Sequence, residues 1–497
     1  MRTSDIQSSG RLPEIFVIGF TAQTPLPDQK DCKRWIGDFL SSEKAIEGRH
    51  LCAVASMSTE ADLLFAEICI DLKIPLRLLL PAPEQYLRDD FDKALSSRLE
   101  NVIRCALSAE SVVDSEAHEK RHLECALEMV TQCQELVVLA NGRSEDENTP
   151  TGEISEFAST TRKPVTIIHR ESETACPVNS KGARNEEDNS ELKFLNELPL
   201  LEKARALAGA NVGPEIIWLT KLDANATAVA PQVRRLTAIP IIFTATAAFI
   251  SGAVSHMHAR AGLVAAAGVL GLVASFLSRL LKLGKKEALW VRIRTAAEIS
   301  RSVLALWDMP ANYRIVGSEI FPEFGGMLRS LNFIKSMGPK DPLDVSVFKE
   351  RYLEERLLDQ RKYFATQSSI SATKGKRYRW AARVFSTIAI FLSLWVSLSP
   401  FFMKGKAVNS GLWLPLAMSG LFQLATISGA ILVINDCDRR QKRYQALDDQ
   451  LASLELELRA FRTWTPVIRV VTKIERILLV ELLEWRSLLQ NKKMPRK

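Results

Sequence analysis

The sequence predicts an α/β Rossmann-like parallel sheet at the N-terminus, followed by an all-α membrane region with four transmembrane helices in two hairpins. Two observations lead to this fold class. Short apolar runs alternate with helical segments through the first 170 residues, and four later stretches of about 18 to 29 residues carry no charge. The averages conceal this division, because 497 residues with 25% charged and 47% hydrophobic side chains resemble an ordinary soluble protein. Composition excludes a collagen, a disordered tail and a small disulfide scaffold.

The N-terminal segment 1–170 is expected to form one doubly wound domain. Apolar runs predict strands at 14–19, 50–55, 75–80, 135–140 and 164–168, with a further candidate at 102–107. Helical patterns lie between them at 30–40, 59–73, 118–133 and 152–161. Runs such as Leu-Val-Val-Leu within 135–140 suit strands that are buried on both faces.

Polar and glycine residues follow three of these strands, where sheets of this type bind ligands. Glycines and hydroxyls at helix starts suit phosphate, and Glu60 and Glu153 suit ribose hydroxyls. The local alternative is N-capping, because Ser58 or Thr59 followed by acidic residues is ordinary capping chemistry. No catalytic residue and no metal ligand is assigned. The candidate ligand-binding residues are Gly19, Thr21, Ser56, Ser58, Thr59, Glu60, Asp62, Asn141, Gly142, Thr151, Gly152 and Glu153.

The charge-free stretches predict transmembrane helices at 236–255, 261–280, 384–403 and 411–434. Basic residues cluster outside both hairpins, whereas the hairpin tips carry only Arg260 and Lys404 with Lys406. By the positive-inside rule, both hairpins enter from the cytoplasm and return to it. We therefore expect a multi-pass protein of the bacterial inner membrane with cytoplasmic N- and C-termini. These clusters account for much of the +7 net charge, so no nucleic-acid partner is inferred.

The two hairpins look like copies of one module. Charged helices with aromatic residues are expected at 287–307 and 438–464, and amphipathic helices at 348–364 and 467–489. This gives a linker at 171–212, a first two-transmembrane module at 213–330 and a second at 331–497. The segment 311–342 is expected to be a connector, since it is rich in glycine and proline.

The eight cysteines form no Cys-x-x-Cys pair and no Cys/His ligand spacing. No secretory signal opens the chain, so these thiols are expected in a reducing compartment. The sequence therefore predicts neither a metal nor a resident cofactor.

Two parts of the sequence resemble known families. Residues 53–83 read AVASMSTEADLLFAEICIDLKIPLRLLLPAP and resemble the Smf/DprA–LOG (SLOG) superfamily of Rossmann-like domains. Ala66-Glu67 matches the Ala-Glu pair of its helix, Leu80-Pro81 matches its strand exit, and residues 135–168 resemble the second half of its pattern. The Pro-Gly-Gly-x-Gly-Thr loop of the nucleotide-hydrolysing LOG enzymes is absent. The resemblance therefore implies a sensor of nucleotide-derived ligands rather than an enzyme.

The C-terminal half resembles the SLATT proteins, which are two-transmembrane effector modules that occur with SLOG domains in bacterial conflict systems. LDQRKYFATQSS (358–369) and RRQKRYQALDDQLASLELELRAFRTW (439–464) carry this likeness. The resemblance implies a membrane part that permeabilises the membrane of an infected cell.

The leading hypothesis is an antiphage effector that binds a nucleotide or nucleotide-sugar, assembles as a homo-oligomer in the lipid bilayer and opens a pore. One alternative is a membrane-anchored N-glycosidase-type enzyme that uses Glu60 or Glu153 as the acid/base group. Another is a resident ligand-gated channel, since SLOG-like domains also occur in melastatin-type channels. The expected lumen-facing residues are Thr244, Thr246, Ser251, Ser386, Ser393, Gln423, Thr426 and Ser428.

Overall fold

The computed structural model describes residues 9–23, 28–46, 48–83, 93–111, 118–140, 149–169, 175–177, 186–210, 212–233, 269, 273, 283–310, 319–337, 343–402, 413–435 and 437–491. The chain forms two compact units that alternate along the sequence. Unit 1 comprises Met1–Leu222 and Ala296–Leu343, and unit 2 comprises Asp223–Thr295 and Asp344–Lys497. The segment 296–343 therefore groups with the N-terminal domain, whereas 223–295 groups with the C-terminal helices. These boundaries differ from the consecutive domains expected at 1–170, 213–330 and 331–497.

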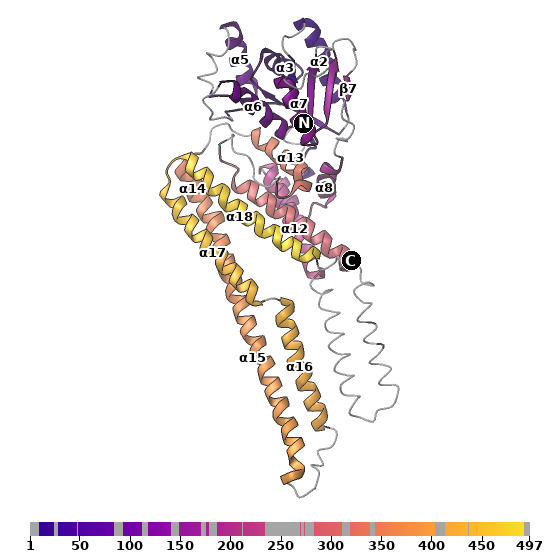
Figure 1. Ribbon diagram of the computed structural model, residues 1–497, viewed down its shortest axis with the longest axis vertical. Helices are drawn as coiled ribbons and strands as arrows, with labels where there is room; N and C mark the ends of the chain where they lie inside the picture. The colour runs from indigo at the N-terminus through magenta and orange to yellow at the C-terminus, as the bar shows by residue number, and fades with distance from the viewer. Residues whose placement is uncertain are drawn as a thin grey trace. The chain divides into compact units, whose positions relative to one another are not determined.

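Unit 1 contains a seven-stranded sheet in the order β4-β3-β2-β1-β5-β6-β7 (Figure 1). Six strands are parallel, and the edge strand β7 runs antiparallel to β6. A mainly parallel sheet with interleaved helices confirms the predicted α/β class. The strands are β1 (Ile15–Ala22), β2 (His50–Ser56), β3 (Leu76–Leu80), β4 (Ser108–Ser111), β5 (Glu135–Ala140), β6 (Val165–His169) and β7 (Ala175–Pro177).

Helices cover both faces of this sheet. Along β1, Phe16 and Phe20 pack with the helices α2 (Gln29–Lys44), α3 (Glu60–Asp71) and α5 (Lys93–Cys105). Ile15 and Val17 pack on the opposite face with α6 (His118–Gln132) and α7 (Pro150–Thr160). Burial of both faces explains why the five inner strands are apolar at nearly every position, as expected from their sequences.

The strand expected at 102–107 is wrong. Val102 lies in α5, and β4 begins only at Ser108. Leu99 and Val102 are buried at a spacing of three residues, so they form the inner face of an amphipathic helix. A short apolar run has no period of its own that separates a strand from such a helix face.

The linker expected at 171–212 contains β7 and two helices, α8 (Glu186–Glu197) and α9 (Glu202–Ala208). Leu192 and Leu195 of α8 are buried, although most of their neighbours in sequence are polar. Asn196 exchanges two hydrogen bonds of 2.9 Å with the backbone of Leu12, immediately before β1. This part of the linker therefore belongs to the folded domain.

The connector expected at 311–342 also contains folded elements, the 3-10 helix η1 (Pro322–Phe324) and the helix α13 (Gly325–Ser336). Met327 and Leu331 of α13 are fully buried, and its Phe333 packs against the sheet core. The hydroxyl of Ser330 donates a hydrogen bond to the carbonyl of Pro13. The Phe333 contact and the Ser330 hydrogen bond thus tie this segment to the sheet and to the residues before it.

The described part of unit 2 is helical. A continuous helix consists of α14 (Val345–Tyr352), a π-helical turn η2 (Leu353–Leu357) and α15 (Leu358–Phe402). It is followed by α16 (Trp413–Asn435), α17 (Cys437–Ala460) and α18 (Trp464–Asn491), while α12 (Leu283–Ala305) contributes residues 283–295. α15 packs along α16 and along α17 (Figure 1). The helices expected at 287–307, 348–364, 438–464 and 467–489 are confirmed.

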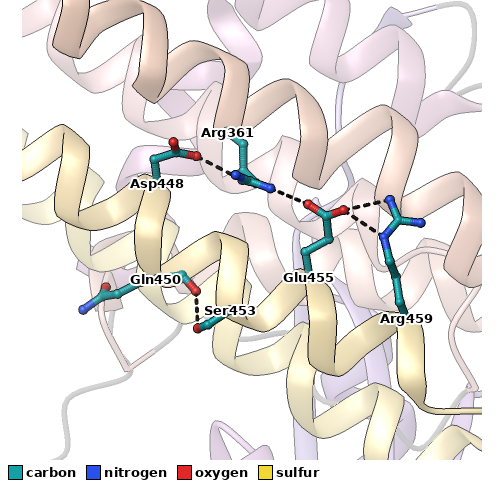
Figure 2. A network of polar contacts seen from close by, with 6 residues as sticks. All are labelled: Arg361, Asp448, Gln450, Ser453, Glu455 and Arg459. Carbon is teal, nitrogen blue, oxygen red and sulfur yellow. Dashed lines mark hydrogen bonds and ion pairs between the residues drawn. The ribbon is translucent and has the colours of Figure 1, made fainter.

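An ion-pair network joins α15 to α17. Arg361 of α15 lies between Asp448 (Nε–Oδ1 3.0 Å) and Glu455 (Nη1–Oε2 2.6 Å) of α17. Arg459, one turn further along α17, contacts the second oxygen of Glu455 at 2.8 Å (Figure 2). All four side chains keep some solvent exposure, so we expect each pair to contribute about 1 kcal/mol or less.

A second network is fully enclosed. Glu475 of α18 is 0% exposed and accepts hydrogen bonds from Arg356 at 3.0 and 2.8 Å and from the Tyr352 hydroxyl at 2.8 Å. Arg356 lies in the π-helical turn η2, which places its side chain toward α18. The two oxygens of this buried carboxylate therefore bind three donors.

Among the described residues, one helix is long and apolar enough to cross a membrane, the continuous helix Val345–Leu398. Only 6% of its apolar 18-residue window is buried, which means that its apolar side chains face outward. α15 covers residues 384–402 of the span predicted at 384–403, and α16 covers residues 413–434 of the span predicted at 411–434. Four spans were expected from the sequence, and the described part of the chain contains one helix that is long and apolar enough to cross a membrane. Those expected at 236–255 and 261–280 lie outside the described residues, apart from Val269 and Val273.

Candidate functional site

The carboxyl edge of the sheet in unit 1 has the crossover at which doubly wound sheets bind ligands. β2 lies on one side of β1 and β5 on the other. The helices that follow β1 and β5, α2 and α7, cover opposite faces of the sheet. In doubly wound sheets, ligands bind where helices leave neighbouring strands toward opposite faces of the sheet.

A capping box forms the start of α3, next to the end of β2. The Thr59 hydroxyl accepts a hydrogen bond from the N–H of Asp62 (3.3 Å), and Asp62 Oδ2 accepts from the N–H of Thr59 (2.9 Å) and Ser58 (3.1 Å). The N-capping role considered for Thr59 is thereby confirmed. The N–H groups of Glu60 and Ala61 in the first turn have no hydrogen-bond partner within the described ranges. They are the donors that this helix start offers to an anion.

Asp62 is an unusual carboxyl for a helix start, because it is only 3% exposed. Burial raises its pKa to about 7, although the three hydrogen bonds from Ser58 and Thr59 lower it. Burial also raises the pKa of the Cys125 thiol, and the charge of Asp62 raises it further. The charge at this helix start therefore changes near neutral pH.

Four polar side chains from α2, α3 and α5 meet beside the capping box. The Gln29 amide donates to Glu60 at 2.6 Å, which joins the first turns of α2 and α3. Arg98 of α5 binds both oxygens of Glu67 at 2.7 and 2.9 Å and lies 3.8 Å from Glu60. Glu60 itself is 42% exposed at its side chain, so it remains accessible to a ligand hydroxyl.

The start of α7 lies at the same carboxyl edge of the sheet, at the end of β1. The Thr149 hydroxyl caps the helix by accepting from the N–H of Gly152 at 3.1 Å. The buried Thr151 hydroxyl donates to the carbonyl of Ala22 at 3.0 Å, which fixes α7 to the end of β1. Glu153 is exposed, and the N–H of Thr151 has no hydrogen-bond partner in the described part of the chain.

The remaining predicted site residues divide into three groups. Thr21 and Ser56 are buried at the ends of β1 and β2 and become neighbours through the pairing of Phe20 with Ala55. Asn141 and Gly142 lie outside the described residues. The third group is Gly19, whose expected place at the strand end is wrong.

Gly19 lies within β1, where it pairs with Val54 and Leu136. A Cβ atom at this position would lie 2.5 Å from the Met129 sulfur and 3.0 Å from the Cys133 sulfur, both on the α6 side of the sheet. Glycine is required here for helix–strand packing rather than for ligand contact. The apolar run ends at Gly19 in the sequence, but the strand continues through Thr21 and Ala22.

Sequence reasoning missed Gln29, Arg98 and Thr149. Thr149 precedes Pro150 and could have been found as an N-cap before a proline at the first helical position. Gln29 and Arg98 had no local signal, because their roles depend on three helices that meet only in the fold.

Among the described residues, no group of three or more His, Cys, Asp or Glu side chains is arranged to hold a metal ion. Seven described cysteines are free thiols, and all but Cys105 are buried. The chemistry available at the edge is therefore N–H donation from two helix starts, hydroxyl contacts and the carboxylate of Glu60.

Comparison with known proteins adds no identification. No known family has a sequence profile that matches the chain, and no curated protein matches its sequence.

Proposed function

We propose that this protein is a membrane-embedded effector of a bacterial defence system that binds a nucleotide-derived ligand at the carboxyl edge of its sheet and then permeabilises the inner membrane. One observation carries the proposal. The same chain combines a crossover edge that has N–H donors at two helix starts with a helix whose apolar window is only 6% buried. A sensor coupled to a membrane element explains why both occur in one polypeptide.

The ligand class follows from the donors and acceptors at the edge. The N–H groups of Glu60, Ala61 and Thr151 suit phosphate oxygens, which also interact favourably with the positive ends of the helix dipoles. The exposed carboxylate of Glu60, held by Gln29 and Arg98, suits a ribose hydroxyl. A nucleotide or a nucleotide-sugar carries both groups, as the SLOG resemblance also implies.

The membrane part of the proposal depends on the outward face of α15. Phe391 is 68% exposed and Trp395 64% exposed, and Ile388, Ile390, Leu394 and Leu398 are also exposed. Such a continuous apolar face is costly in water but stable in a lipid bilayer. With α16 as the second helix, and with the spans expected at 236–255 and 261–280, the protein is a four-span protein with cytoplasmic N- and C-termini.

The pore itself is proposed to need several copies of the chain. The hydroxyls of Ser393, Thr426 and Ser428, expected to face a lumen, donate to backbone carbonyls of their own helices at 2.7–2.9 Å. Hydroxyls that donate within their own helix can face lipid, so a single copy of the chain does not need a water-filled lumen around them. The pore therefore forms on assembly of several copies. Ligand binding favours this assembled state, which must bind the ligand more tightly than the resting state does. Without charged rings in the spans, weak ion selectivity is expected.

Mass spectrometry of the small molecules that co-purify with the full chain in detergent tests the sensing function. We expect a nucleotide-derived compound with wild-type protein and a reduced amount with Glu60→Gln. Glu156→Gln, an exposed position later in α7, is the matched control and should retain the compound. Loss of the compound in both variants, or in neither, would contradict the proposed edge.

Bacteria that express the protein, followed with a membrane-potential dye, test the membrane function. Depolarisation only upon phage infection supports the effector, whereas constant ion flux supports a resident channel. Incubation of purified protein with NAD and common nucleotides separates the effector and the channel from the enzyme hypothesis. Release of a free base would identify an N-glycosidase-type enzyme that uses Glu60 or Glu153.

A further inference from the structure

α15 changes its chemistry abruptly at Arg383. Residues 374–383 contain five basic side chains, and the following nineteen residues to Phe402 contain no charge. No aspartate or glutamate occurs between 360 and 402. The helix therefore carries an unneutralised positive segment directly beside its apolar segment.

Most of these basic side chains point away from the protein. Lys374, Lys376, Arg377 and Arg383 are exposed, and no carboxylate in the described part of the chain pairs with them. Arg379 differs, because it binds Asp438 of α17 at 2.9 and 2.7 Å. The helix thus uses one basic residue for internal packing and presents four to the outside.

α17 adds a further charge near Lys374. A Cβ atom on Gly375 would lie 3.3 Å from the Cβ of Cys437, so α15 and α17 approach closely at this point. Arg440, in the first turn of α17, is exposed. We call Lys374, Lys376, Arg377, Arg383 and Arg440 the basic collar.

The spacing along α15 matches the layers of a bilayer. At 1.5 Å per residue, 384–402 is about 28 Å long, close to the hydrocarbon thickness of about 30 Å. Lys376, Arg377 and Arg383 then lie within about 12 Å of the boundary, where their long side chains reach the headgroups. Trp380, which is 67% exposed, lies among them at the depth that indoles favour.

We propose that the basic collar binds the phosphate groups of anionic phospholipids in the leaflet where α15 enters the membrane. This inference rests on the proposed function, because it requires α15 to span the bilayer. Charge complementarity selects the lipid class, since anionic headgroups such as phosphatidylglycerol carry no cation to oppose the collar. Lipid bound here holds the charged and apolar segments of α15 at a fixed depth.

Quenching of Trp380 by brominated lipids tests the inference. The full chain is reconstituted in vesicles with dibrominated phosphatidylglycerol or dibrominated phosphatidylcholine, and the Trp380 signal is the difference from Trp380→Phe. We expect wild-type protein to be quenched preferentially by phosphatidylglycerol, with a preference that weakens at high salt. In the variant Lys376→Gln/Arg377→Gln/Arg383→Gln, the preference for phosphatidylglycerol over phosphatidylcholine should fall at least about fivefold.

The matched control is Lys362→Gln/Lys473→Gln/Arg476→Gln, which removes three exposed charges from other parts of the same unit. It should keep the wild-type preference. Equal loss in both triple variants would mean that net charge, not the collar, attracts the lipid.

Alkaline carbonate extraction separates the proposed membrane span from the proposed lipid binding. If the chain is extracted, the span and this inference both fail; if it resists extraction but shows no lipid preference, this inference alone fails.

Discussion

Replacement of Glu475 by glutamine is expected to destabilise unit 2 by about 3–5 kcal/mol. The side chain is fully buried and receives two hydrogen bonds from Arg356 and one from Tyr352. A neutral amide keeps the size of the side chain but removes the negative charge that balances Arg356. The guanidinium, only 8% exposed, is then left as an uncompensated charge in the helix core.

The magnitude follows from burial rather than from the number of hydrogen bonds. Exposed ion pairs contribute at most about 1 kcal/mol, because water solvates either partner after the other is lost. Water is largely excluded from Arg356 in the folded state, so most of its desolvation cost remains uncompensated. The Tyr352 hydroxyl keeps an acceptor in the amide oxygen and contributes little to the difference.

Hydrogen exchange of the full chain, followed by mass spectrometry, measures the effect. Peptides from α14, the π-helical turn and the middle of α18 should exchange roughly 10²- to 10⁴-fold faster in Glu475→Gln, while strands of unit 1 serve as an internal reference. Asp448→Asn is the matched control. It removes one carboxylate from the partly exposed network in Figure 2 but leaves the Arg361–Glu455 pair, so at most about fivefold faster exchange is expected.

Arg356→Met/Glu475→Leu completes the test, because removing both charges should restore much of the protection. If Glu475→Gln changes exchange no more than Asp448→Asn, or if the double variant is the least stable of the set, the reasoning from burial is refuted.

Three further predictions concern the sheet and the membrane helix. Since the pKa of Asp62 is raised from 3.8 to about 7, its contribution to stability is complete at low pH and is lost as the pH rises through about 7. Urea unfolding of unit 1 should therefore show about 2–3 kcal/mol less stability at pH 8 than at pH 5, and Asp62→Asn should abolish the difference; a pH dependence that persists in the variant would assign it to another group. Gly19→Ala should cost about 1–3 kcal/mol in the same unfolding assay, because the new methyl overlaps Met129, and an unchanged midpoint would show that α6 can move away. Leu394→Arg should oppose membrane insertion by about 3 kcal/mol and increase the carbonate-extractable fraction, whereas extraction equal to wild type would place this face outside the lipid.

The five inner strands of the sheet were predictable because each is buried on both faces and is therefore apolar along most of its length, whereas the edge strand β4 alternates between buried and exposed residues and was not predicted. The start of α3 was predictable from a local pattern, since Thr59 with Asp62 is a capping pattern within four residues. The cap of α7 by Thr149 was missed, and so were the pKa of Asp62 and the contacts around Glu60. The pKa of Asp62 depends on its burial in the folded domain, and the contacts of Gln29 and Arg98 depend on three helices meeting.

Segments with mixed composition were the least predictable. The expected linker and connector both contain helices whose few apolar residues, such as Leu195 and Leu331, are buried by distant parts of the chain. Gly19 illustrates the opposite error, because a glycine after an apolar run indicates a strand end locally but serves close packing in the fold. Tertiary contacts, which no single segment encodes, decide both cases.

The central claim is that ligand binding at the sheet edge opens the membrane. It is tested most directly by reconstituting the full chain in vesicles polarised by a potassium gradient with valinomycin, and adding ATP, NAD, ADP-ribose or a nucleotide-sugar while a voltage-sensitive dye is recorded. The account predicts that the vesicles stay polarised until one of these compounds is added, and that Glu60→Gln weakens the response. Ion flux that is the same with and without every compound would contradict it.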